Sequence, residues 1–432
     1  SSVNNPSEIS DKSIYGDGTN SVIVMRHSTS LDQPLFTITS AGSAITLKNV
    51  IIDGGAIWDE NGAAGTNSGL RATSVLINAF NESFYTKLIL DENVVLQNND
   101  KEYTSLQNYT ETGSGIFIQG ELTSNSNTNQ IRTCCGIRGC AIQLFNNSKL
   151  NFYKGIIGGS SAKDANCSKM AGAAINCDYV TTPSNPGAEV ILGSATNASD
   201  GSDVKISYNK CLSDGVVVIF GYSTLKAYNI TISNNSGNRR CSGLYISRNS
   251  EGEVTGSFIK NNELTQSEPG GSVYVDSDST LKMSDVEISS NVHSNGPGAA
   301  IYLDSTWLNV YLNNVTLKDN SSSSSGSDIY NYGNLYISGK NSLGDIYMAS
   351  SNGYIYPRNY YDSTGTGTSS ISSPLQVATG SYMGTITHVE ESNFPTNDYD
   401  PADSSTYIQV LNETTAGDMS GLTSLFKLNV ST

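Results

Sequence analysis

ISYN at residues 206–209 is followed along the chain by ISNN at 232–235, IKNN at 259–262, ISSN at 288–291 and LKDN at 317–320. Each of these stretches has the pattern of a short β-strand that ends on an asparagine. Successive asparagines are 26, 27, 29 and 29 residues apart, which matches three short strands with their turns. The spacing therefore predicts a solenoid in which one repeat forms one coil.

A second motif precedes each coil, where small residues lead into a strand of alternating apolar side chains. It occurs as SGLYI (242–246), GGSVYV (270–275), GAAIYL (298–303) and GSDIYN (326–331). A third strand lies between the two motifs, as in TLKAYNITISNN (224–235). The alternation has period 2, and no segment sustains the 3.6-residue period of a helix. We therefore predict an all-β fold, a right-handed parallel β-helix of three-strand coils with about 26–29 residues each.

The repeat divides the chain into three parts. Residues 44–361 are predicted to form the parallel β-helix, because strand patterns such as AITLKNVIIDGG (44–55) extend it upstream. A Gly-, Ser- and Thr-rich break begins at residue 362, and the alternating segments after it lack the asparagine. A solenoid must cover the open sheet edge at each of its ends. We therefore expect an N-terminal cap at residues 1–43 and a C-terminal β-rich cap or terminal coils at residues 362–432.

The recurring asparagines are expected to stack on one another along the axis. Asparagine tolerates the left-handed backbone of a tight corner, and stacked amides can hydrogen-bond in a ladder. The alternative is a role as glycan or metal ligands, but the chemistry of the turn already requires these residues. We assign a structural Asn ladder to Asn209, Asn235, Asn262, Asn291 and Asn320.

Composition and charge exclude several classes of partner. The chain has 24 Lys and Arg against 40 Asp and Glu, so its formal net charge is -16. A phosphate backbone or an anionic membrane surface would repel such a chain, and we expect no nucleic-acid partner. No run of about 18 apolar residues occurs, so the sequence predicts no membrane-spanning segment.

Cysteine and histidine usage gives no metal site. Seven cysteines lie between Cys134 and Cys241, but they lack paired CxxC spacing, so they indicate small buried residues or disulfides. The pair that we expect is Cys211 with Cys241, in equivalent loops of neighbouring coils. The histidines, at positions 27, 293 and 388, are far apart in the chain.

A column of tyrosines is the most distinct surface feature that the sequence predicts. Tyr245, Tyr274, Tyr302 and Tyr330 are 29, 28 and 28 residues apart, at the outward position of one strand. Stacked aromatic rings on an outer face would suit sugar rings or a partner protein, which makes these residues candidate ligand-binding residues. The alternative is that the rings only stabilise the sheet, by ~0.2–1 kcal/mol per cross-strand pair.

The two motifs resemble the repeats of polymorphic outer-membrane-protein-like surface proteins, which carry GGA-I/L/V and F-x-x-N motifs. The counterparts of the first are residues 172–175, 270–273 and 298–301. The counterparts of the second are Ile206 with Asn209, Ile232 with Asn235, Ile259 with Asn262, Ile288 with Asn291 and Leu317 with Asn320. This chain departs from the pattern by using Ile or Leu where that family favours Phe. The resemblance covers roughly residues 93–340 and implies a β-helix with an adhesin-type role.

Enzymes are the alternative, because polysaccharide lyases and glycoside hydrolases also use this solenoid, and both need clustered carboxylates. The candidate acids are Asp178, Asp214, Asp276, Asp278 and Asp304, and the densest basic group is Arg239, Arg240 and Arg248. No set of adjacent acid and base recurs with the coil spacing, so we assign no catalytic residue. Two oxygen-rich loops, 197–203 and 397–403, could bind Ca²⁺, but neither has the spacing of a known Ca²⁺ loop, and no cofactor is assigned.

These features together predict an extracellular or cell-surface β-solenoid that is not an enzyme and that acts in adhesion or as a structural or fibre component. A rigid rod holds its binding surfaces away from the cell by repetition alone. The expected partners are a host or partner glycan or protein, or further copies of the chain in a fibre. A glycan-active β-helix enzyme remains the alternative.

Overall fold

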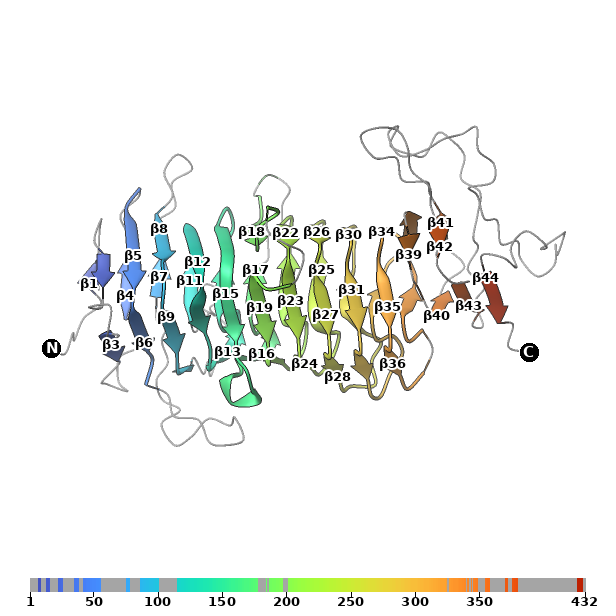
Figure 1. Ribbon diagram of the computed structural model, residues 1–432, viewed down its shortest axis with the longest axis horizontal. Helices are drawn as coiled ribbons and strands as arrows, with labels where there is room; N and C mark the ends of the chain where they lie inside the picture. The colour runs from blue at the N-terminus through green and yellow to red at the C-terminus, as the bar shows by residue number, and fades with distance from the viewer. Residues whose placement is uncertain are drawn as a thin grey trace.

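The chain folds as a parallel β-helix in the computed structural model, with its strands stacked along one long axis (Figure 1). The structure describes residues 42–55, 86–100, 115–177, 186–196, 201–324 and 326–338, together with shorter segments between and beyond them. Every strand pairing among these residues is parallel, and partners come from consecutive coils, as in Tyr245 with Tyr274. The predicted fold class is therefore confirmed.

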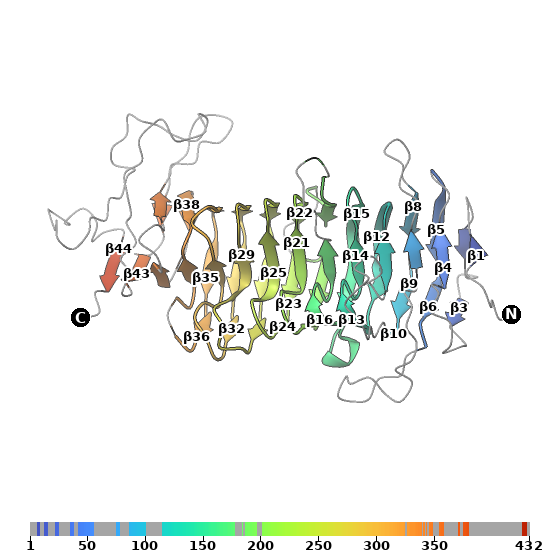
Figure 2. The same cartoon turned by 180° about the vertical axis from the view of Figure 1, so that it is seen from behind.

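Three sheets form the walls of the solenoid, and Figure 2 shows the same stack from behind. Sheet 1 contains, in spatial order, β1 (Ser7–Glu8), β4 (Phe36–Ile38), β7 (Val75–Ile77), β11 (Ile116–Ile118), β14 (Ile142–Leu144), β17 (Ile175–Cys177), β21 (Val217–Phe220), β25 (Cys241–Ser247), β29 (Gly271–Val275), β33 (Ile301–Leu303), β37 (Ile329–Asn331), β40 (Asp345–Met348), β43 (Leu375–Thr379) and β44 (Phe426–Asn429). Sheet 3 contains β10 (Asn99–Asp100), β13 (Cys134–Arg138), β16 (Cys167–Ala171), β20 (Lys210–Cys211), β24 (Ser236–Gly237), β28 (Glu263–Leu264), β32 (Val292–His293) and β36 (Ser321–Ser322).

Sheet 2 consists of two strips that meet at a bend. Strip 2a contains β2 (Ser13–Tyr15), β5 (Ala44–Lys48), β8 (Lys87–Leu90), β12 (Glu121–Ile131), β15 (Lys149–Gly158), β18 (Glu189–Leu192), β22 (Thr224–Tyr228), β26 (Glu251–Thr255), β30 (Thr280–Ser284), β34 (Asn309–Asn313), β38 (Asn334–Ser338) and β41 (Tyr354–Pro357). Strip 2b contains β3 (Val22–Met25), β6 (Val50–Asp53), β9 (Val94–Gln97), β19 (Val204–Ser207), β23 (Ile230–Ser233), β27 (Phe258–Lys260), β31 (Glu287–Ser289) and β35 (Thr316–Lys318), and β12 and β15 pair with both strips. The remaining elements are β39 (Lys340–Asn341), β42 (Ser370–Ile371) and the short 3₁₀ helix η2 (Ala162–Asp164).

The bend in sheet 2 corrects one detail of the prediction. TLKAYNITISNN, expected to form one strand, is divided into β22 and β23 at Asn229, whose φ is 54°. The same left-handed backbone recurs at Gly256, Asp285 and Asn314 in the following coils. These residue types adopt that conformation at low cost, so each turns the chain without a loop. A coil such as 217–237 therefore has four short strands on three sheets.

The core is a continuous stack of aliphatic side chains between the sheets. In sheet 1, Leu244 pairs with Val273, which pairs with Ile301, and none of the three is more than 1% exposed. Strip 2b contributes the column Ile206, Ile232, Ile259, Ile288 and Leu317. Burial of one such side chain contributes about 1.5–3 kcal/mol. Apolar residues recur at alternate positions of the short strands because every second side chain points into this core.

The predicted Asn ladder is present. Asn209 Nδ2 donates to Asn235 Oδ1, Asn235 Nδ2 to Asn262 Oδ1, Asn262 Nδ2 to Asn291 Oδ1, and Asn291 Nδ2 to Asn320 Oδ1, each at 3.0 Å. Each acceptor oxygen also receives the backbone N–H of the preceding ladder residue, at 2.9–3.1 Å. The ladder continues upstream, because Asn166 Nδ2 donates to Asn209 Oδ1 at 2.8 Å.

The backbone reason given for these asparagines is wrong, because the left-handed corner lies one residue earlier. Positive φ values occur at Tyr208, Asn234, Asn261, Ser290 and Asp319, each of which directly precedes a ladder asparagine. The ladder positions require asparagine because of its side-chain amide and not because of its backbone conformation. Four of the five are at most 1% exposed. Their amides pair with backbone groups of the preceding coil, as Asn262 does with Asn235 N and Ile232 O.

The ends of the predicted domain division stay a prediction. Strands β1, β2 and β3, within residues 1–43, pair in parallel with β4, β5 and β6, so coil structure reaches into the expected N-terminal cap. Strands β42, β43 and β44 likewise pair in parallel within residues 362–432.

Asn262→Ala tests the ladder. Its amide makes four hydrogen bonds, to Asn235 N and Nδ2, to Ile232 O and to Asn291 Oδ1. The substitution removes all four, although Asn291 Oδ1 keeps the backbone N–H of residue 262 and Asn235 Nδ2 keeps Ile206 O. We expect the free energy of unfolding in urea to fall by about 3 kcal/mol. The control is Asn295→Ala, because that amide is exposed and, among the described residues, donates one hydrogen bond, to Thr265 O. Equal effects of the two substitutions would contradict a structural ladder.

Candidate functional site

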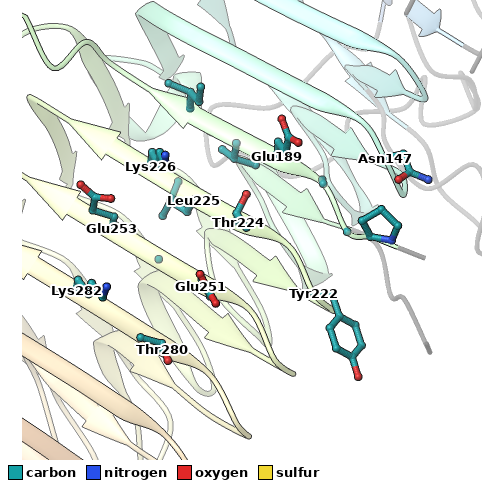
Figure 3. A pocket seen from close by; sticks show the side chains of 16 residues that line it. Asn147, Glu189, Tyr222, Thr224, Leu225, Lys226, Glu251, Glu253, Thr280 and Lys282 are labelled. Atoms are coloured by element: carbon teal, nitrogen blue, oxygen red, sulfur yellow. The ribbon is translucent and has the colours of Figure 1, made fainter. Parts of the chain in front are cut away.

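A groove runs along the outer face of strip 2a, across strands β18, β22, β26 and β30 (Figure 3). Its volume is about 510 Å³. Neighbouring strands are ~4.8 Å apart, so four strands give the groove a length of about 14 Å along the solenoid axis. The groove therefore has the form of a shallow channel parallel to the rod.

Two columns of outward side chains line the groove. Glu189, Thr224, Glu251 and Thr280 are successive partners in the strand register and form the first column. In the second column, Lys226 pairs with Glu253 and Glu253 with Lys282. Period-2 alternation places both columns on the outside, because Leu225, between Thr224 and Lys226, is 2% exposed and faces the core.

Charges in the groove are mixed and almost balanced. Glu189, Glu251 and Glu253 face Lys226 and Lys282, and Lys149 Nζ lies 3.0 Å from a Glu189 carboxylate oxygen. Next to the groove, burial and the neighbouring Glu253 carboxylate raise the pKa of Tyr228, which keeps that phenol protonated as a donor. The lining thus offers hydroxyls, carboxylates and ammonium groups without a strong charge of one sign.

Aromatic side chains extend this face beyond the groove. Tyr222 lies at the corner where the strands begin, two residues before Thr224. Trp307 holds the equivalent place before Asn309, three coils further along, and is 76% exposed. On the strip itself, Tyr311 and Tyr336 stack with their ring centroids 4.5 Å apart, and Lys282 Nζ lies 5.9 Å from the Tyr311 centroid.

Sequence reasoning missed the groove residues because they do not repeat. Thr224, Glu251 and Thr280 occupy one position of successive coils, where the side chain changes between Thr and Glu, whereas the motif search looked for the same side chain in every coil. Aligning the coils and comparing only their outward positions would have indicated this polar strip.

The predicted tyrosine column stacks as expected but is not an open platform. Ring centroids of Tyr245, Tyr274, Tyr302 and Tyr330 are 5.2, 5.1 and 5.0 Å apart. The first three residues are only 2%, 3% and 2% exposed, so the expected ligand-accessible surface is absent there. The turns between sheets 3 and 1 pack on the rings, so closely that a Cβ at Gly298 would lie 3.2 Å from Tyr302 Cδ2.

The structure brings together acids and a base that the sequence spreads over several coils. Tyr245 and Tyr274 donate their hydroxyls to Asp276 and Asp304, and Arg240 Nη1 lies 3.3 Å from Asp214 Oδ1. Burial raises the pKa of both tyrosines, so their hydroxyls stay protonated. These groups bond one another, which favours a structural role for the column. Asp278 lies in a corner at φ 55°.

The predicted Cys211–Cys241 disulfide is not formed in the structure. Cys211 pairs in register with Gly237, whereas Cys241 pairs with Gly271, so the two residues hold different coil positions. Both thiols are free and buried. Burial raises the pKa of Cys211 to about 11, and Cys241 Sγ donates to Ser272 O at 3.3 Å.

Several other predicted positions give no site. Asp178, the loop 397–403 and residues 197–200 of the other oxygen-rich loop lie outside the described residues. Within the part of the chain that the structure describes, no three His, Cys, Asp or Glu side chains are grouped to hold a metal ion. No helix among the described residues is long and apolar enough to cross a bilayer.

The fold and the groove define a class, a parallel β-helix with a polar channel on one outer face. In comparison with known proteins, no family model, no curated protein and no solved structure matches this chain. The resemblance to polymorphic outer-membrane-protein-like repeats therefore rests on its motifs alone.

Asp304→Asn tests the electrostatics of the tyrosine column. Partial desolvation raises the pKa of Asp304 above its ordinary value. The hydrogen bond from Tyr274 lowers the pKa, but by less. Folding then favours the protonated acid, so the stability that this group contributes falls as the pH rises through the raised pKa. We expect the unfolding free energy of the native chain, relative to the Asn variant, to decrease between pH 4 and pH 7.

Glu287→Gln is a control for which the opposite pH dependence is expected. Both variants are unfolded with urea at each pH. Desolvation raises the pKa of Glu287, but hydrogen bonds from Lys318 and Ser289 outweigh it and lower the pKa. The native chain should therefore gain stability relative to this variant as the pH rises. The same trend for both variants would contradict the assignment.

Proposed function

We propose that this chain is an extracellular or cell-surface adhesion protein, not an enzyme, and that it binds a glycan chain in the groove on strip 2a. The observation that carries the proposal is a channel lined by four consecutive coils with balanced charge and polar side chains. Sugars offer many hydroxyls and no net charge, so they suit a lining that both donates and accepts hydrogen bonds.

The shape of the channel supports an extended ligand. A linear polymer laid along the axis meets equivalent positions at each coil, here Thr224, Glu251 and Thr280. The exposed Trp307 ring and the Tyr311–Tyr336 pair continue that path and offer flat apolar faces to sugar rings. A nucleic acid would be disfavoured by the net charge of -16.

Glu253→Ala with Lys282→Ala tests the groove. The two residues are register partners within it, and loss of two hydrogen bonds to charged groups, each ~1.5–3 kcal/mol, should weaken binding by about a hundredfold or more. Neutral glucan, galactan and mannan oligosaccharides are titrated calorimetrically, with heparin as the charged probe. The matched control is Glu287→Ala with Lys318→Ala, an ion pair of 3.0 Å on strip 2b. Equal affinity of both variants for a bound glycan would rule out the groove.

Trp307→Ala tests the extended path. Because the ring is 76% exposed, its removal should leave the melting temperature unchanged within about 1 °C. We expect a threefold to tenfold loss of affinity for long oligosaccharides and a smaller loss for disaccharides, which do not reach beyond the groove. Unchanged affinity for every chain length would confine the site to strands β18–β30.

A glycan-active enzyme is the second candidate, favoured by one observation. Glu251 and Glu253 both line the groove from a single strand, and side chains two residues apart in a strand are ~6.6 Å apart along it. That separation falls within the range of ~6.5–9.5 Å for the acid and base of inverting glycosidases. New reducing ends or unsaturated products, lost in Glu251→Gln and Glu253→Gln, would establish the enzyme. Binding without products would support the adhesion protein.

A further inference from the structure

Two cysteines lie opposite each other on neighbouring coils, although the sequence analysis did not predict them as a pair. Cys135 of β13 and Cys167 of β16 are register partners in sheet 3. Paired residues on adjacent parallel strands have Cα atoms ~4.8 Å apart, which lies within the span of ~4.4–6.8 Å that a disulfide bridges. Both side chains therefore start from the same side of the sheet at bridging distance.

The exposure of this pair distinguishes it from the other cysteines. Cys167 is half-buried and Cys135 is 8% exposed, and the next residue of their column is the exposed Lys210. Cys134, the chain neighbour of Cys135, points to the opposite side and is fully buried in the core. Its thiol donates to Arg132 O at 3.2 Å, and burial raises its pKa to about 12.

Polar contacts hold the same two coils in register around the pair. Asn166 Oδ1 accepts the backbone N–H of Cys134 at 3.0 Å, and Asn166 Nδ2 donates to Ile131 O. Arg132 Nη1 lies 3.2 Å from Asp164 Oδ1. The backbone flanking each sulfur is thus fixed on both strands, so a bridge would need only side-chain rotation.

We propose that Cys135 and Cys167 are the site of a cross-coil disulfide, formed by exchange with a small-molecule disulfide such as oxidised glutathione. The more exposed Cys167 sulfur attacks one glutathione sulfur, so a mixed disulfide forms, the glutathione S–S bond breaks and one glutathione thiol leaves. Cys135 then attacks Cys167 Sγ, the protein disulfide forms and the second glutathione thiol leaves. Two cysteines are oxidised, one glutathione disulfide is reduced, and both thiol protons pass to the glutathione products.

The bridge closes the chain between residues 135 and 167, which includes β14, β15 and η2. Cross-linking lowers the entropy of the unfolded chain and links two neighbouring coils through β13 and β16, the second and third strands of sheet 3. This inference is independent of the groove, which lies on strip 2a.

Peptide mapping of the native chain tests the bridge. Folded protein is treated with oxidised glutathione or with dithiothreitol, then denatured, alkylated and digested with trypsin without reduction. We expect TCCGIR (133–138) linked to DANCSK (164–169) only in the oxidised sample, and loss of two of the seven alkylated thiols. Absence of the linked peptide from folded, oxidised protein would overturn the proposal.

Two variants identify the sulfur within TCCGIR, which contains both Cys134 and Cys135. The link should disappear in Cys135→Ser and persist in Cys134→Ser, whose hydroxyl can replace the thiol donor to Arg132 O. If the link is lost in Cys134→Ser and kept in Cys135→Ser, the bridge is formed by Cys134 and the proposal is overturned.

Thermal unfolding provides the second readout. Oxidation should raise the melting temperature of the native chain by about 5 °C, and this difference should vanish in Cys135→Ser and Cys167→Ser. Cys177→Ser, a buried core cysteine, is the control in which the difference persists. If the peptides are linked but oxidation leaves the melting temperature unchanged, the link does not stabilise the folded coils, and the proposal of a stabilising cross-coil disulfide is overturned.

Discussion

Hydrogen bonds between neighbouring coils hold this solenoid together, because a short strand of one coil has no partner within that coil. Each strand pairs in parallel and in register with its equivalent one repeat later, as Val273 does with Ile301. A slip of one residue would turn every inward side chain outward, so the aliphatic core and the backbone pairing fix the same register. The Asn ladder, the tyrosine column and the groove are all consequences of that register.

The elements that repeat could be predicted from the sequence, and those that do not repeat could not. The positions of Ile259 and Asn262 recur in five consecutive coils because the core and the corner impose the same requirement each time, so their spacing predicted the fold and the ladder. The corner itself was misplaced by one residue, because ISNN and IKNN have asparagine at both positions. Only backbone dihedral angles separate Asn234 from Asn235.

Burial of the tyrosines depended on turns whose sequences differ from coil to coil. The alternation of side chains correctly predicted that Tyr274 and Val273 lie on opposite faces of the strand. It cannot predict which turns pack on the face that carries Tyr274. The turn at residues 294–298 crosses the rings, and His293 joins it to the preceding turn through Pro297 O and Gln266 O. A position that points away from one core can therefore still be enclosed by a second, smaller one.

Each ladder asparagine donates to the next coil and accepts from the one before, so the upper and lower surfaces of a coil are complementary. Consecutive coils are therefore interchangeable modules. If one 26- to 29-residue unit were duplicated or deleted, the ladder asparagines of the newly adjacent coils could still pair. The sequences of the neighbouring coils would not need to change. The length of the rod can thus change in whole coils during evolution, while its cross-section stays constant.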